Sequence, residues 1–573
     1  MKKLFAILLI FITIFSLCAC NPDKTGIIKN VDAKSLLNDA FIDPVNEWHI
    51  YDNLIAQIKA ETNYQKRTEL IHKAEDILMA NGCVIPLYYA NDIYLQKEYV
   101  ENVYCNVFSY KYFQNVNMKN NSKTIRVNLA GEPDSLDPAF ITSNDGGSLI
   151  VNSFAGLYTY DKNGKTVPDL ASGYTVSKPD KDGCVTFTFT LKENLKCSDG
   201  SILDANDFVY SWKRASNEKT GSDYGYMFSQ FVGYPNDLNV SAPDKNTLVF
   251  TLKEPCAYIE SLMATPTFFP VKRFSVESYV NWQTEPTKWC NDAGFISNGP
   301  FICTGWTHGK SMVFEKNPYY HNASMVTINK IEFTLSSDAT DIYGYYKNSK
   351  LDFIDNVPAD AIKKLKNSSE LKIIDNPGTH FISFNAKSDL FTEKTAEESA
   401  CMRLALNILI DREYIAEAVG QTYQVAANSF IPLGMNDGNG GIFKSTAESN
   451  AYYSLNVNND TIEKARTFLK AAGFIFDKNG KLSSKTPIVI EYLTINNTNY
   501  VMEAQAIKAD FEELGVQMTI KKVDWNTYIQ TRKEGNFDII REGLFADFDD
   551  PVNMLEFFTT DSENNYCNFG SKK

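Results

Sequence analysis

Hydrophobic and polar positions follow two different rhythms along this chain. The stretch "VTFTFTL" (residues 185–191) alternates strictly, which is the period-two pattern of a strand with one buried face. The stretch "YDNLIAQIKAETNYQKRTELIHKAEDILM" (residues 51–79) repeats apolar residues every three or four positions, with Leu54, Ile55 and Ile58 on one face. We therefore expect a half-buried strand in the middle of the chain and a pair of helices near its beginning.

The second half alternates between the two rhythms. "YVMEAQAIKADFEELG" (residues 500–515) predicts a helix, and "VQMTIKKV" (residues 516–523) predicts a strand directly after it. The polar stretch "NVNMKNNSKT" (residues 115–124) has no apolar periodicity and is typical of a linker. Alternating strands and helices indicate an α/β architecture, with a middle part that is richer in strands.

The first twenty residues predict export. "MKK" is followed by an apolar run over residues 4–17, which is shorter than the roughly 20 residues of a membrane-spanning helix and fits a signal peptide. "LCAC" (residues 17–20) resembles a bacterial lipobox, which implies cleavage before Cys20 and lipid attachment to its sulfur. The alternative is an ordinary signal peptide with an incidental cysteine. We expect a protein anchored by lipid to the outer face of a bacterial cell membrane.

Composition excludes several function classes. The chain of 573 residues is long enough for several cores, and 56 Lys and Arg against 70 Asp and Glu give a net charge of −14, which disfavours nucleic-acid binding. The cysteines are irregularly spaced without a C-x-x-C pair, so we expect mostly buried thiols and no zinc or redox motif. H-E-x-x-H, G-x-S-x-G and P-loop motifs are missing, so the sequence predicts neither an enzyme nor a cofactor or metal site.

Seven blocks resemble, in order, the extracellular oligopeptide-binding lipoproteins of ABC importers. The blocks are "NLAGEPDSLDPAF", "GLYTYDKNGKTVPDLASGYTVS", "FTLKENLKCSDGSILDANDFVYSWKRA", "SNGPF", "FEKNPYYHNA", "MRLALNILIDREYI" and "NFDIIREGLFADFDDPVNMLEFF". The resemblance implies an α/β, two-lobed fold like that of periplasmic binding proteins, with an extra domain in one lobe. It also implies a monomer that captures oligopeptides in its cleft and passes them to permease subunits in the membrane.

The order of the blocks departs from the family. The family ends in a helical pair and a strand similar to "VIPLYY", and here both stand at the front, so the chain resembles a circular permutation. We divide it into a signal peptide (1–19), a tether (20–48), the displaced segment (49–118), a linker (119–123), one lobe (124–165 and 296–380 with 84–118), an extra domain (166–295) and a second lobe (381–573 with 49–83). Permutation is tolerated where natural ends lie close together and the new break is exposed.

The resemblance places the ligand site in the block "TRKEGNFDIIREGLFADFDDP". It implies that Asp547 binds the α-amino group of the ligand and that the backbone of Gly543 and Phe545 pairs with the ligand main chain. Arg532 and Arg541 align with arginines near the other end of the ligand.

Trp525 aligns with an aromatic residue that stacks on a ligand side chain, whereas Leu544 stands where the family often has tryptophan. Each assignment has an alternative. Asp547 could be a loop or helix-cap residue like its neighbours Asp549 and Asp550, the arginines could be structural ion-pair partners, and Trp525 could belong to the core.

Three other functions stay open at this stage. The chain could bind another solute, such as a nickel chelate or a cell-wall peptide. It could be a peptide-sensing surface lipoprotein without a transport role. It could also be a rearranged, non-functional product that does not fold.

Overall fold

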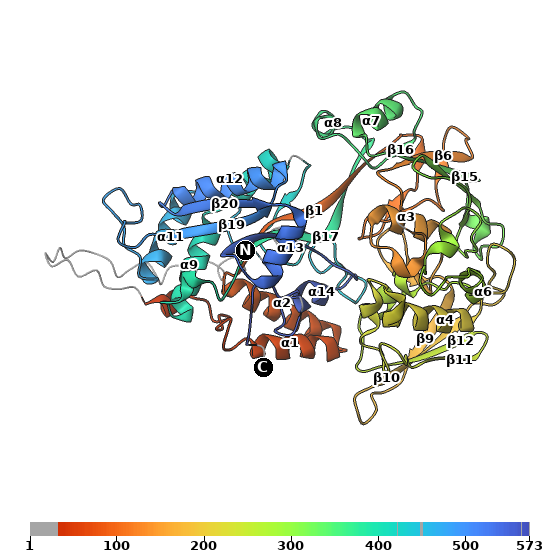
Figure 1. Cartoon of the computed structure of the whole chain (residues 1–573), viewed down its shortest axis with the longest axis horizontal. Helices are drawn as coiled ribbons and strands as arrows, with labels where there is room; N and C mark the ends of the chain where they lie inside the picture. The colour runs from red at the N-terminus through yellow and green to blue at the C-terminus, as the bar shows by residue number, and fades with distance from the viewer. Residues whose placement is uncertain (1–31, 134, 421, 447–450, 563, 572–573) are drawn as a thin grey trace, which may run out of the picture.

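A computed structural model describes residues 32–571, apart from 134, 421, 447–450 and 563. The predicted signal peptide (1–19) and Cys20 lie outside the described residues. The described part is a mixed α/β protein with two lobes, as the sequence predicts (Figure 1).

One mixed sheet runs through both lobes. Its strand order is β13-β14-β15-β6-β16-β1-β17-β21-β19-β20, and β18 pairs with β1 at one side. Lobe I holds the first five strands: β13 (Phe301–Thr307), β14 (Ser311–Lys316), β15 (Lys330–Leu335), β6 (Thr124–Leu129) and β16 (Phe353–Ile354). Lobe II holds β21 (Ile539–Phe545), β19 (Val489–Ile495), β20 (Gln517–Val523) and β18 (Val425–Ala426).

Two long strands connect the lobes. β1 (Val84–Gln96) and β17 (Leu371–Phe384) are antiparallel to each other; the far end of β1 pairs with β16, and the far end of β17 pairs with β21 (Figure 1). The ladder between them is interrupted between the pairs Tyr89↔Thr379 and Asn91↔Asp375. A second irregularity lies between Pro86 and Tyr88, and such features bend a strand pair and leave backbone groups unpaired.

Helices cover both lobes. Lobe I carries α3 (Asn144–Ser153), α7 (Ala339–Lys347) and α8 (Ala359–Lys364). Lobe II carries α1 (His49–Ala60), α2 (Tyr64–Ala80), α9 (Ala396–Ile408), α10 (Arg412–Tyr414), a π-helix (Ile415–Gly420), α11 (Asn459–Ala471), α12 (Thr498–Glu512), α13 (Trp525–Glu534) and α14 (Pro551–Glu556). The helix α9 begins with a capping box in which Thr395 and Glu398 satisfy each other's backbone N–H groups.

The extra domain forms a sheet of its own. Its order is β11-β12-β10-β9, from β9 (Ala171–Val176), β10 (Val185–Leu191), β11 (Val240–Asp244) and β12 (Thr247–Leu252), with α4 (Ala205–Ser216), α5 (Ile259–Met263) and α6 (Arg273–Glu277). The strictly alternating stretch is β10, and its Phe187 and Phe189 face inward as predicted. Trp212 of α4 is fully buried, and its Nε1 donates to the carbonyl of Phe268 at 2.8 Å.

Small two-stranded ladders complete the described part. They are β2 (Val100–Glu101) with β5 (Asn117–Met118), β3 (Tyr104–Cys105) with β4 (Lys111–Tyr112), and β7 (Tyr158–Tyr160) with β8 (Thr166–Pro168). The nine described cysteines are free thiols, and seven of them are buried. None of the described helices has the length and apolar character needed to cross a membrane.

Residues 32–48 differ from the expected tether. The 3-10 helix Ala33–Leu36 lies against α9, and the fully buried Trp48 stacks on Phe569 with ring centroids 4.1 Å apart. Its Nε1 donates to the carbonyl of Phe558 at 2.8 Å. This segment is therefore held to lobe II at both of its ends, by the 3-10 helix and by Trp48.

Candidate functional site

The site is built around strand β21. One edge of β21 pairs with β17 from Ile539 to Phe545, whereas β19 pairs with the other edge only at Ile539 and Ile540. In the described part of the sheet, the second edge from Arg541 to Phe545 therefore has no strand partner. An open edge of this kind can accept an extended peptide as an added strand. Gly543 and Phe545 lie on this segment, as the assignment of backbone contacts requires.

Part of this segment is exposed to solvent. A Cβ atom at Gly378 would lie 2.5 Å from Cδ1 of Phe545, so only glycine lets the Phe545 ring lie over β17. Phe545 is 45% exposed, and Gly543 is also exposed. An exposed aromatic ring beside an open backbone edge suits contact with a ligand.

Asp547 lies two residues beyond β21, in the loop before α14. Its carboxylate accepts a hydrogen bond from the hydroxyl of Tyr226, and its backbone N–H donates to Oδ1 of Asn553 at 2.6 Å. The described residues include no cation within ion-pair distance of it. Burial, with a smaller contribution from the charge of Glu556, raises the pKa of Asp547 to about 6.

Tyrosines surround this carboxylate. Burial and the charge of Asp547 raise the pKa of Tyr224 to about 12 and raise those of Tyr226 and Tyr110 further. The three phenols therefore lie within the electrostatic field of Asp547. An ammonium group entering here would meet one carboxylate and the hydroxyl of Tyr226. These tyrosines could not be predicted from the sequence, because Tyr226 is 321 residues from Asp547.

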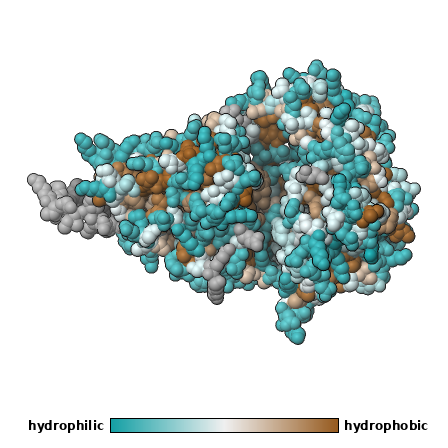
Figure 2. Space-filling view, viewed as in Figure 1, coloured by the Kyte–Doolittle hydropathy of each residue, from teal (hydrophilic) through white to brown (hydrophobic). Residues whose placement is uncertain are grey.

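The neighbours of Asp547 bind the extra domain. Phe548 stacks on Tyr258 with ring centroids 4.4 Å apart, and the backbone N–H of Asp549 donates to Oγ of Ser261 at 2.9 Å. A cavity of about 390 Å³ is lined from both sides of this contact, among others by Tyr226 and Asn553. Figure 2 shows a hollow between the two lobes. Asp547 thus stands where lobe II meets the extra domain.

Asp550 has a structural role. It is fully buried and forms two hydrogen bonds of 2.8 Å with the guanidinium of Arg67. It also caps α14 by accepting from the N–H of Val552, which confirms its expected role. Asp549, also expected to be a cap, instead accepts from the N–H of Asn436 at 2.9 Å, and burial raises its pKa to about 7.

Arg541 is held inside lobe II. It is 6% exposed, and its Nη2 lies 3.1 Å from the hydroxyl of Tyr88 and 2.9 Å from Nδ1 of His380. Glu503 pairs with its Nε at 3.4 Å, and the ring of Tyr500 lies 3.7 Å from the guanidinium carbon. The geometry favours the ion-pair alternative for this arginine. Burial, followed by the Arg541 charge, lowers the pKa of His380 to about 3, so this imidazole is neutral.

Arg532 is partly occupied. It pairs with Glu542 at 3.0 Å and lies 4.0 Å from the ring centroid of Tyr566. Its Nε is buried and has no hydrogen-bond partner among the described residues. Arg532 and Gly543 line one cavity of about 140 Å³, together with Leu544. An acceptor group reaching this cavity would find a free donor.

Trp525 is the most exposed of the predicted site residues. Its side chain is 58% exposed at the start of α13, and its ring stacks on Tyr528 at 6.0 Å. The alternative of a core tryptophan is therefore wrong. An exposed indole supported by a second ring remains available for stacking.

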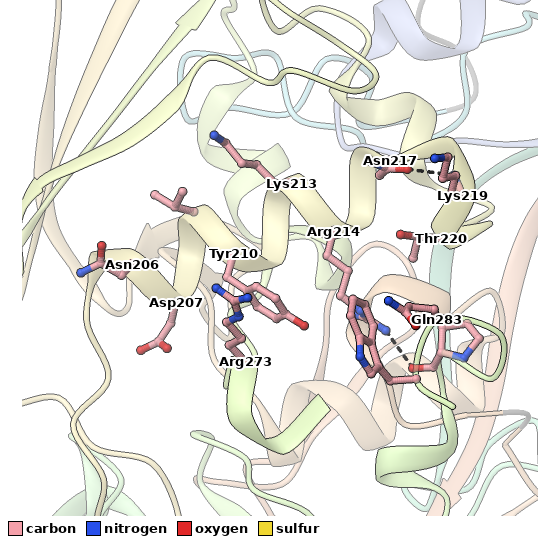
Figure 3. A pocket seen from close by; sticks show the side chains of 13 residues that line it. Asn206, Asp207, Tyr210, Lys213, Arg214, Asn217, Lys219, Thr220, Arg273 and Gln283 are labelled. Carbon is pink, nitrogen blue, oxygen red and sulfur yellow. Dashed lines mark hydrogen bonds between the residues drawn. The ribbon is translucent and has the colours of Figure 1, made fainter. Parts of the chain in front are cut away.

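A second large cavity lies away from β21. Figure 3 shows this cavity of about 880 Å³ in the extra domain, lined by residues between Asn206 and Pro286. Both of its arginines are paired: Arg214 with Asp137 of lobe I at 2.5 Å, and Arg273 with Glu277 of the extra domain at 3.0 Å. None of the predicted site residues lines it. In the part of the chain that the structure describes, no group of three or more His, Cys, Asp or Glu residues is arranged to hold a metal ion.

Known proteins are similar to this chain in sequence and fold. The family described as bacterial extracellular solute-binding proteins, family 5 Middle, matches residues 165–566. The dipeptide-binding protein DppE of Bacillus subtilis is 27% identical over 460 residues, which are 79% of each chain. The periplasmic oligopeptide-binding protein OppA of Salmonella typhimurium is 28% identical over 466 residues, which are 78% of this chain and 79% of the relative.

Solved structures agree with the sequence comparison. The unliganded open form of the murein tripeptide-binding protein MppA matches with a TM-score of 0.62 and 26% identity, over 79% of this chain and 84% of that one. The peptide-bound OppA of Listeria monocytogenes matches with a TM-score of 0.56 and 25% identity, over 79% and 86%. These proteins have two α/β lobes, and the family consists of solute-binding proteins of ABC transporters rather than enzymes. The chain belongs to the family 5 bacterial extracellular solute-binding proteins.

Proposed function

We propose that this protein binds oligopeptides outside the cytoplasm and delivers them to the permease subunits of an ABC transporter. The observation that carries the proposal is Asp547, a partly buried carboxylate beside an open strand edge, with no cationic partner among the described residues. A carboxylate partly removed from water is stabilised when a ligand supplies a cation. The α-ammonium group of a peptide is such a cation.

The peptide lies extended along the open edge of β21. Its amino group pairs with Asp547, and its main chain hydrogen-bonds to the backbone of Gly543 and Phe545. Its far end points toward Arg532, whose Nε is a free donor, and one side chain stacks on Trp525. We assign no ligand contact to Arg541, because its guanidinium is already occupied.

Binding closes the cleft by a population shift. A peptide that touches both lobes favours the closed arrangement by its extra contacts there, and the interrupted ladder between β1 and β17 absorbs the motion. The site on β21 and the extra domain then enclose the peptide.

The test is Asp547→Asn in soluble residues 21–573, titrated calorimetrically with a pool of tri- to pentapeptides. Loss of the counter-charge should weaken binding about 10- to 100-fold, because charged hydrogen bonds contribute roughly 1.5–3 kcal/mol. Asp182→Asn, which removes a carboxylate that is 69% exposed in the extra domain, is the control and should bind as the unchanged protein does. Equal affinity of both variants would remove Asp547 from the site.

The lipid anchor is proposed from the sequence alone. Cys20 follows a typical signal peptide and would carry the acyl chains that hold the protein at the membrane. Cys20→Ser should release the protein from the membrane fraction into the medium. Continued membrane association of that variant would contradict the lipobox.

We also propose that the chain is a circular permutation of the family order. Three hydrogen bonds support this: Tyr51 OH to the carbonyl of Leu555 (2.9 Å), Thr560 N–H to Asp52 (2.9 Å), and Gly570 N–H to the carbonyl of Pro44 (2.8 Å). The helices α1 and α2 lie beside α14 near the other end of the chain (Figure 1). Strand β1 occupies the middle of the sheet, so the displaced segment is an integral part of the fold.

Reordering the gene tests the permutation. A chain made of residues 124–573 followed directly by residues 49–118 should fold cooperatively and bind the same peptides with similar affinity. Thermal unfolding with and without peptides measures both properties. A reordered chain that does not fold, beside a natural chain that does, would contradict the proposal.

A further inference from the structure

The hydroxyl of Tyr226 hydrogen-bonds to the carboxylate of Asp547, to which we assign the amino group of the ligand. This hydroxyl donates to Oδ2 of Asp547 from the 3-10 helix Gly225–Phe228 of the extra domain. The contact does not stand alone, because Phe548 and Asp549 of the same loop also bind the extra domain through Tyr258 and Ser261. Three consecutive residues of lobe II thus hold the extra domain in place.

The helix that carries Tyr226 is firmly fixed, whereas its side chain is not. The neighbouring Met227 and Phe228 are 5% and 0% exposed, but Tyr226 itself is 43% exposed. The phenol can therefore leave Asp547 by rotation about its side-chain torsions, without movement of the backbone. In the described structure no other side chain donates a hydrogen bond to the Asp547 carboxylate.

We propose that Tyr226 is a placeholder for the ligand amino group, which satisfies Asp547 in the empty protein and has to be displaced by an incoming ammonium. This inference rests on the proposed function and adds to it a cost that every ligand has to overcome. Both the phenol and an ammonium donate to the charged carboxylate, but the ammonium also forms an ion pair that the neutral phenol cannot form. The exchange is favourable for a peptide with a free amino terminus.

A blocked amino terminus makes the same exchange unfavourable. An N-acetylated peptide would displace the phenol and leave Asp547 without a cation, so it loses the hydrogen bond and gains no ion pair. The placeholder therefore lowers the affinity by the same factor for every ligand that displaces the phenol, and only a ligand with an ammonium recovers this loss through an ion pair.

The test compares trialanine and N-acetyl-trialanine on the unchanged protein and on Tyr226→Phe, by calorimetric titration at pH 7. Removal of the hydroxyl should tighten binding of trialanine and of N-acetyl-trialanine by a similar factor of roughly 10 or more, the effect of one hydrogen bond to a charged group, and should leave the preference for the free amino terminus unchanged. Tyr279→Phe is the matched control, because it removes another phenol–carboxylate contact of the extra domain, 3.4 Å from Tyr279 to Glu285. The Tyr279→Phe variant should bind trialanine and N-acetyl-trialanine with the affinities of the unchanged protein.

A pH profile adds a readout that a purely structural tyrosine would not move. The Tyr226 hydrogen bond lowers the pKa of Asp547, so in Tyr226→Phe the rise of trialanine affinity with pH should occur at higher pH. Weaker binding of trialanine by Tyr226→Phe would show instead that the hydroxyl supports the bound ligand, and would overturn the proposal.

A double-mutant cycle keeps the proposal testable without any ligand. If the contact exists in the empty protein, Tyr226→Phe and Asp547→Asn should shift the unfolding temperature non-additively. Additive shifts would overturn the placeholder. Failure of the unchanged protein to bind trialanine or the peptide pool, beside non-additive shifts, would contradict the proposed function while leaving the contact established.

Discussion

Asp547 and Asp550 lie three residues apart in one loop, yet only Asp550 has a cationic partner among the described residues. Asp550 is fully buried and receives both arms of the Arg67 guanidinium at 2.8 Å. Asp547 is partly buried, its carboxylate accepts a hydrogen bond from the hydroxyl of Tyr226, and no described cation lies within ion-pair distance. A buried charge with its own counter-ion serves the structure, whereas one without a counter-ion is available for a ligand.

The same contrast separates the two arginines predicted for the site. Arg541 has a carboxylate, a phenol, an imidazole and an aromatic ring around it. Arg532 has one carboxylate, the rings of Tyr566 and Tyr528 and one phenol hydroxyl around it. The Nε of each arginine has no hydrogen-bond partner among the described residues, but that of Arg541 lies 3.4 Å from a carboxylate oxygen of Glu503. The extent of pairing, rather than the type of residue, decides which arginine can serve a ligand.

The largest expected effect comes from removing the partner of Asp550. Arg67→Met would leave a carboxylate buried without a counter-charge, which costs about 3–5 kcal/mol of folding free energy. Urea unfolding of the soluble protein measures the loss. Lys66→Met is the control: its side chain is 67% exposed, and its pair with Glu61 contributes about 0–1 kcal/mol. Equal stability of the two variants would contradict a structural role of the Arg67–Asp550 pair.

A smaller loss is expected where the partner of Arg541 is changed. Glu503→Gln keeps a hydrogen-bond acceptor for Tyr88 but removes the charge that faces Arg541, so we expect a cost of about 2–3 kcal/mol. Peptide affinity of the folded variant should stay within about twofold of normal, because Arg541 serves the strand rather than the ligand. Glu513→Gln, at the exposed end of the same helix, is the control for both measurements. A large loss of peptide affinity in Glu503→Gln, with normal stability, would show that Arg541 contributes to ligand binding.

Sequence patterns predicted the elements of this fold better than its contacts. The alternation over residues 185–191 coincides with β10, and the amphipathic stretch 51–79 appears as α1 and α2, because side-chain periodicity is a local property. The burial of Trp48 could not be predicted, since an isolated aromatic in a polar segment reveals nothing about Phe569, 521 residues away. The contact of Tyr226 with Asp547 could not be predicted for the same reason.

The resemblance to a family added what periodicity could not. It singled out Asp547 among three neighbouring acidic residues, and the structure shows that these three differ in their partners. The role of Arg541 could not be decided in this way, because its pairing depends on Glu503 of α12 and on Tyr88 of β1, which come from distant parts of the chain. Alignment identifies a position, whereas packing determines what that position can do.

The pH dependence of binding gives the smallest effect and the sharpest comparison of the two aspartates. Burial raises the pKa of Asp547 to about 6, so below pH 6 the carboxyl is mostly protonated and an ammonium ligand has to expel the proton. Affinity for trialanine should therefore rise about tenfold per pH unit up to about pH 6, which is roughly 1.4 kcal/mol per unit. It should then stay level until the α-amino group of the peptide loses its proton near pH 8. Titration calorimetry between pH 4.5 and 9 measures the profile, and Asp547→Asn should flatten its acidic limb. An acidic limb that persists in Asp547→Asn would assign the titrating group to another residue, such as Asp549 with its pKa of about 7, and the contrast within the loop would have to be redrawn.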